Sequence, residues 1–74
     1  MFTTSDLSLA TTLMTDGFNL AELNRDDPRR VGFVFEDSND LKEAIKQYWN
    51  NELLVEPQAY FNNMKQLKNR MYNN

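Results

Sequence analysis

The sequence contains no cysteine and no histidine, and its 74 residues include only two glycines and two prolines. Without cysteine there is no disulfide framework, thiolate metal site or thiol nucleophile, and without histidine the usual imidazole base is missing. The glycines, Gly17 and Gly32, are too few and too far apart to form a phosphate-binding loop. These absences predict a protein that is not an enzyme and uses no metal or cofactor.

Carboxylates are the only catalytic groups that the sequence offers in clusters. Glu36, Asp37 and Asp40 lie close together, and Asp26 and Asp27 form a second pair. Two carboxylates can divide acid and base roles when their surroundings separate their pKa values. The first cluster, however, falls at the start of an expected helix, where the helix dipole favours negative charge. Helix capping is therefore preferred over catalysis or metal binding.

Long apolar runs are also absent. No run approaches the ~20 residues of a membrane-spanning helix, and the first residues lack the basic start of a signal peptide. The absence of cysteine fits a reducing compartment, so we expect a cytoplasmic protein without membrane contact. The length allows one domain, residues 1–74. Because so short a chain buries only about 60–65% of its unfolded surface, a homodimer is slightly favoured over a monomer.

Apolar spacing predicts a first helix over residues 5–16, capped by Thr4 or Ser5 and stopped by Gly17. Its buried stripe consists of Leu7, Ala10, Leu13 and Met14. A β-hairpin follows, with strands over 18–23 and 31–36 joined by a polar turn. The first strand alternates imperfectly, which indicates a bulge near Ala21 and Glu22. In the second strand one face is apolar and carries Val31, Phe33 and Phe35.

The second half of the chain predicts two more helices. One begins at residues 37–38 and ends near Asn50, and residues 53–55 then form a short extended segment, a candidate third strand. The last helix spans 57–72 with Pro57 in its first position. Its seam consists of Tyr60, Met64, Leu67 and Met71, widened by Phe61. The predicted class is α+β in the order α-β-β-α-(β)-α, with an antiparallel hairpin sheet packed by helices on one face.

Positive charge is concentrated at the C-terminal end. Residues 57–74 contain Lys65, Lys68 and Arg70 and no acid, although the whole chain carries −3. Lys65, Lys68 and Tyr72 share one stripe of the expected helix, a pattern suited to phosphates and a stacked base. Arg29 and Arg30 on the hairpin turn would extend this stripe. Basic residues also suit the negative end of a helix dipole, so a purely structural role stays open.

A second candidate surface is aromatic. Trp49 lies beside the apolar stripe of its helix, next to Tyr48 and close to Leu53. A half-exposed tryptophan with such neighbours is typical of a protein-binding surface. Burial in the core is an equally good interpretation of Trp49.

Several segments together resemble a known family. They are residues 4–7, 17–18, 33–37, 48–50, 55–57 and 65–72, and their order matches as well. The chain resembles a small domain family of unknown function that occurs in bacterial, archaeal and phage genomes. The resemblance implies a small standalone protein often linked with mobile elements, and it implies no activity, substrate or catalytic residue.

The leading hypothesis is a non-enzymatic accessory protein of a phage or mobile element that contacts nucleic acid. The residues expected to bind are Arg29, Arg30, Lys65, Lys68, Arg70 and Tyr72. One alternative is an acidic inhibitor that binds a protein of a host defence complex through Tyr48, Trp49 and Leu53. Another is a structural protein that self-assembles through the C-terminal seam.

Overall fold

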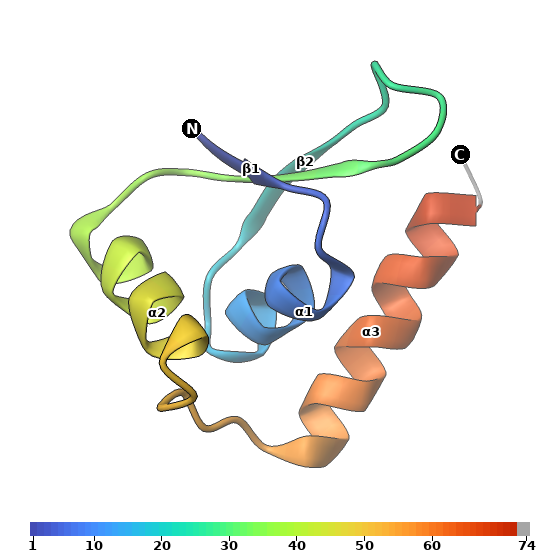
Figure 1. The fold of residues 1–74 in the computed structure, drawn as a ribbon. Coiled ribbons are helices and arrows are strands. Elements are labelled where there is room, and N and C mark those ends of the chain that lie inside the picture. The colour runs from blue at the N-terminus through green and yellow to red at the C-terminus, as the bar shows by residue number, and fades with distance from the viewer. Residues whose placement is uncertain (73–74) are drawn as a thin grey trace.

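The computed structural model describes residues 1–72 and has six elements (Figure 1). In chain order these are β1 (Phe2–Thr4), α1 (Leu7–Thr15), β2 (Leu20–Asn24), β3 (Gly32–Phe35), α2 (Asn39–Trp49) and α3 (Pro57–Tyr72). The three strands form one antiparallel sheet, and the three helices pack on one of its faces. The predicted α+β class is confirmed.

The central strand of the sheet is β3, with β1 on one side and β2 on the other. Both neighbours are antiparallel to β3, so β1 and β2 run parallel to each other and are linked through α1. The predicted bulge is confirmed, because the β2–β3 register shifts between Leu20 and Glu22. This shift brings both Leu20 and Leu23 against the core.

The third strand is formed by Phe2–Thr4 rather than by residues 53–55. Phe2 pairs with Phe35 and Thr4 with Phe33. The central strand β3 is therefore paired on one side by β1 and on the other by β2. Residues 53–55 adopt no strand, and Leu54 is 89% exposed. The prediction placed the extra strand wrongly because a three-residue strand carries almost no periodic signal.

The centre of the molecule is α1, which packs against both other helices and the sheet (Figure 1). Five consecutive residues of α1 are buried, namely Leu9, Ala10, Thr11, Thr12 and Leu13. The buried threonines satisfy their hydroxyls within the helix, because Thr11 donates to the Leu7 carbonyl at 2.7 Å and Thr12 to the Ser8 carbonyl at 2.8 Å. These two threonines can therefore be buried without leaving a hydroxyl unpaired.

The ends of α1 are set by Asp6 and Gly17. Asp6, and not Thr4 or Ser5, is the N-cap, and its carboxylate accepts from the Leu9 amide at 3.2 Å. Gly17 stops the helix as predicted, with a φ of 110° in the left-handed region. Its amide donates to the Met14 carbonyl, and the Phe18 amide donates to the Leu13 carbonyl. These two bonds form a Schellman motif.

The other helices begin and end much as predicted. The Ser38 hydroxyl caps α2 by accepting from the Leu41 amide at 3.0 Å, and Asn51 closes the helix with a φ of 60°. The Glu56 carboxylate caps α3 just before Pro57. Within residues 1–72, no helix is both long enough and apolar enough to cross a bilayer.

The inner face of α3 carries the predicted seam. Leu67 is fully buried, while Tyr60, Met64 and Met71 are half-buried. Phe61 does not widen the seam, because its side chain is 59% exposed. Phe61 lies about 120° around the axis of α3 from the buried Leu67, so its ring is left on the solvent side.

Leu67→Ala tests whether the α3 seam holds the fold together. Removing a fully buried leucine should lower the free energy of unfolding by about 2–5 kcal/mol, measured by urea denaturation. The control is Gln66→Ala, an exposed neighbour on the same helix, which should change it by less than about 0.5 kcal/mol. Equal effects of the two variants would contradict this packing.

Candidate nucleic-acid interface

Arg25 joins the hairpin loop to the C-terminal end of α3. Its Nη1 donates to the Met71 carbonyl at 3.0 Å, and its Nη2 donates to the Arg70 carbonyl. Carbonyls in the last turn of a helix have no partner within the helix, and a cation is favoured at this negative end of the dipole. One guanidinium thus connects two segments that lie more than forty residues apart in the chain.

Side-chain turns fix the shape of the loop that follows Arg25. The Asn24 amide oxygen accepts from the Asp26 amide at 2.9 Å, and the Asp27 carboxylate accepts from the Arg29 amide at 2.8 Å. Asp27 also lies 4.0 Å from Arg30 Nε in a weak, exposed ion pair. The loop is therefore held by its own side chains, and Arg29 and Arg30 both remain exposed.

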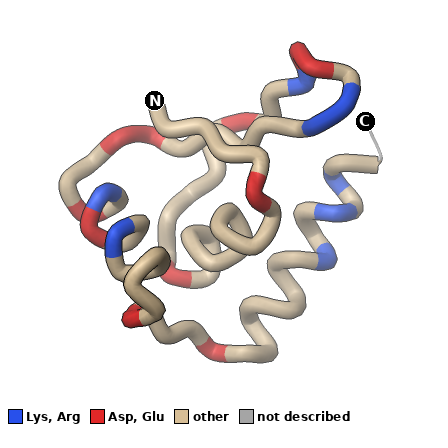
Figure 2. Tube along the Cα trace, in the orientation of Figure 1, with Lys and Arg blue, Asp and Glu red and all other residues tan. Residues whose placement is uncertain are grey.

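The loop and the end of α3 enclose a hollow of about 350 Å³. Arg29 and Arg30 line it from the loop, and Met71 and Tyr72 line it from α3. In Figure 2 the basic segments of the loop and of α3 lie on the same side of the molecule. The fold therefore brings the predicted loop arginines and Tyr72 to one place.

The predicted residues of α3 do not all share one face. Lys65, Lys68 and Tyr72 are exposed, and their spacing puts them within an arc of about 60°. Arg70 is also exposed, but it points about 160° away from Lys68. Within residues 1–72, no carboxylate forms an ion pair with any of the three α3 cations.

Phe61 belongs to this exposed arc and was missed by the sequence prediction. The Lys65 ammonium lies over its ring, 4.8 Å from the centroid. Phe61, Lys65, Lys68 and Tyr72 follow one another along α3, and we call these four residues the aromatic–basic row. The signal in the sequence was the spacing of four residues between Phe61 and Lys65, which places them on the same side of a helix.

The predicted protein-binding residues have different environments. Trp49 is 62% exposed and meets the Tyr48 ring edge to face at 5.0 Å. Tyr48 itself is half-buried, and Leu53 packs against the core. The Tyr48 hydroxyl donates to Ser8 Oγ at 3.0 Å, and Ser8 Oγ makes a further hydrogen bond to the Tyr60 hydroxyl at 3.1 Å. Tyr48 thus helps to join the three helices, and of the three residues only Trp49 is exposed.

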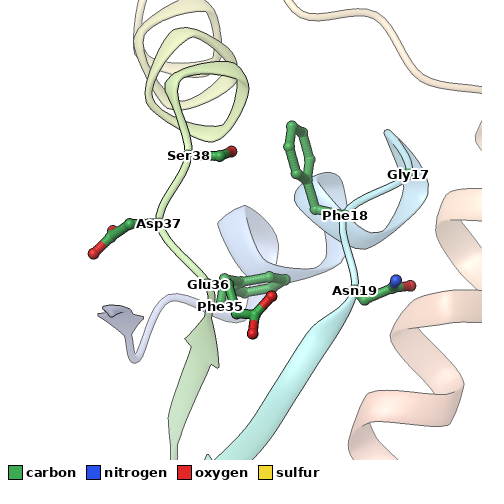
Figure 3. A pocket seen from close by; sticks show the side chains of 7 residues that line it. All are labelled: Gly17, Phe18, Asn19, Phe35, Glu36, Asp37 and Ser38. Atoms are coloured by element: carbon green, nitrogen blue, oxygen red, sulfur yellow. The ribbon is translucent and has the colours of Figure 1, made fainter.

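A second, smaller hollow of about 250 Å³ lies between residues 17–19 and 35–38. Figure 3 shows the Asp37 side chain pointing away from it, and the Asp37 carboxylate pairs with the N-terminal amine at 2.9 Å. The Ser38 hydroxyl is occupied as the cap of α2. Because the Glu36 and Asp37 carboxylates point in different directions (Figure 3), they do not form an acid–base pair. In the part of the chain that the structure describes, no group of three or more acidic side chains is placed to hold a metal.

A family model described as a domain of unknown function, DUF5659, matches residues 1–73. The chain belongs to this family. Neither a curated protein nor a solved structure matches the chain. The function of this DUF5659 domain therefore has to be inferred from its own residues and their arrangement.

Arg25→Gln tests whether Arg25 holds the loop against α3 in the DUF5659 domain. Losing a charged donor to two helix-end carbonyls should lower the free energy of unfolding by about 1 kcal/mol. It should also accelerate hydrogen exchange of amides in residues 25–31, measured by NMR. The control is Arg29→Gln, which removes the same charge from a loop residue that hydrogen-bonds to Asp27 through its backbone amide, which the variant keeps. If both variants behave alike, Arg25 does not hold the loop.

Proposed function

We propose that this protein is a non-enzymatic accessory protein that binds nucleic acid through α3 and the hairpin loop. The observation that carries the proposal is the Arg25 contact, because it brings the loop cations beside the end of α3. We define the basic side as residues 25–30 and 57–72. The basic side contains six of the eight basic residues and two acids, for a charge of +4, whereas the rest of residues 1–72 carries −7.

This separation of charge supports binding in one orientation. Guanidinium and ammonium groups on the basic side would contact phosphates, and these contacts supply most of the affinity for nucleic acid. The acidic remainder of the molecule repels the same polyanion. The net charge of −3 therefore opposes binding of nucleic acid to the whole surface, but it is compatible with binding at the basic side.

The proposed setting is the cytoplasm of a cell that carries a phage or another mobile element. The support is the sequence resemblance of the chain, and the genes beside its own would test the setting. Replication genes would support a nucleic-acid partner, whereas defence and counter-defence genes would support a protein partner. The proposed homodimer is tested by light scattering at high protein concentration.

Two charge-matched double variants test nucleic-acid binding. Replacing Lys65 and Lys68 by glutamine should weaken binding to a fluorescent DNA or RNA at least about tenfold at low salt, measured by anisotropy. The slope of log affinity against log salt should fall by about 2, since two phosphate contacts are lost. The control replaces Lys42 and Lys46 of α2, which removes the same charge outside the basic side and should reduce affinity far less.

Two results would contradict the proposal. One is the absence of binding to any single- or double-stranded DNA or RNA at low salt. The other is an equal loss of affinity in both double variants, because binding would then follow total charge and not the basic side.

A second candidate function is protein binding, favoured by the exposure of Trp49 and Leu54. Their side chains are 62% and 89% exposed, and Glu52 and Glu56 flank Leu54 in the α2–α3 connection. Such a surface suits a protein with an apolar pocket and a basic rim, as in the nucleic-acid channel of a host defence complex. Self-assembly through the α3 seam is less well supported, because that seam packs against α1 in the same chain.

Replacing Trp49 and Leu54 by alanine tests protein binding. If the protein is an inhibitor, the wild type should recover a stoichiometric partner from a host lysate, and the double variant should lose it. Such exposed residues contribute little to folding, so both proteins should unfold at similar urea concentrations. The control is Asn62→Ala, an exposed change on α3 that should retain the partner. A partner retained by the double variant would exclude Trp49 and Leu54 as the binding surface.

A further inference from the structure

We infer that the basic side selects single-stranded nucleic acid, with bases stacked on Phe61 and Tyr72. This inference rests on the proposed function and adds the class of ligand to it. It is carried by the aromatic–basic row, which has an exposed aromatic ring at each end and two ammonium groups between them.

The two rings are exposed to solvent. Phe61 is 59% and Tyr72 is 79% exposed, whereas the two phenylalanines of β3 are each 1% exposed. Eleven helical positions separate Phe61 from Tyr72, which is about 16 Å along the axis of α3. Both rings therefore face solvent on the same side of one rigid helix.

The position of Lys65 supports a ligand that combines bases with phosphates. Its ammonium covers one face of the Phe61 ring, 4.8 Å from the centroid. A base would therefore stack on the opposite face of the ring, and the cation beside the ring would be close to a phosphate of the same strand. Lys68 continues the row toward Tyr72. Proteins that bind single strands commonly combine aromatic rings, which stack on bases, with cations that follow the backbone.

A duplex cannot use the faces of these rings. Its bases are already stacked on one another, and only their edges are accessible in the grooves. An unpaired strand can splay its bases onto aromatic side chains. The same lysines would bind phosphates of either form, so the rings are what separates single strands from duplexes.

A nucleic-acid strand bound along α3 would extend into the hollow beside Tyr72. Arg29 and Arg30 line it from the loop, and Arg25 holds that loop against the end of α3. A strand that lies along the row from Phe61 to Tyr72 would therefore reach two more guanidinium groups. The inferred path runs along α3 and ends at the hairpin loop.

Three probes of equal length test this inference by anisotropy at low salt. They are an oligothymidylate of about 15 nucleotides, an abasic strand with the same phosphates, and a duplex. The wild type should bind the oligothymidylate at least about tenfold more tightly than either other probe, since each stacked base contributes about fivefold or more. The abasic strand separates stacking from attraction to phosphates.

Phe61→Ala and Tyr72→Ala test the rings themselves. Each change should weaken oligothymidylate binding about fivefold or more and leave abasic binding unchanged. The control variants are Gln66→Ala and Asn69→Ala, which alter exposed residues of α3 outside the row and should not change either affinity. Circular dichroism and urea denaturation check that every variant is folded.

The outcomes distinguish this inference from the proposed function. Equal binding of the oligothymidylate and the abasic strand would overturn the inference and leave phosphate binding intact. Tighter binding of the duplex would overturn it as well and would indicate groove recognition by α3. Failure of all three probes to bind would overturn both.

Discussion

The fold depends on the burial of α1. This helix packs against α2, α3 and the sheet, and five of its residues in a row are buried. A helix in that position has no polar face to turn toward water, so its threonines donate to carbonyls one turn earlier. Ser8 bonds both Tyr48 and Tyr60. Within the described residues, no buried side-chain nitrogen or oxygen lacks a partner, which removes a cost that a small domain cannot offset.

The position of α1 also decides where the basic side forms. Because α3 packs along α1, its C-terminal end lies beside the hairpin loop (Figure 1), where Arg25 bonds the last carbonyls of the helix. The inner face of α3 is used by the seam around Leu67, which leaves the aromatic–basic row in solvent. Packing and charge are thus coupled, since the same helix supplies part of the core and three of the eight exposed cations.

The candidate site was predictable from the sequence only in part. The cluster of bases in the last helix and the stripe of Lys65, Lys68 and Tyr72 follow from composition and a period of 3.6 residues. The sequence did not reveal that Phe61 belongs to the exposed row, because the same spacing fits a widened core seam. It also did not reveal the role of Arg25, since nothing local indicates that a loop residue bonds carbonyls of a distant helix. Nor did it reveal that Tyr48, a candidate for the protein-binding surface, bonds Ser8 of α1.

The sequence by itself determined the number and type of the helices, the hairpin with its bulge, the stop at Gly17 and the end of α2 near Asn50. These features depend on neighbours within a few residues, through apolar period, capping and left-handed turns. Only the tertiary structure decided that Phe2–Thr4 and not residues 53–55 forms the third strand. It alone decided which side of α3 meets water and that the loop arginines lie beside Tyr72. Those outcomes depend on contacts between segments that are distant in the sequence. The third strand is fixed because β3 can pair with only two strands, and the exposed side of α3 is fixed because α1 can bury only one face of that helix.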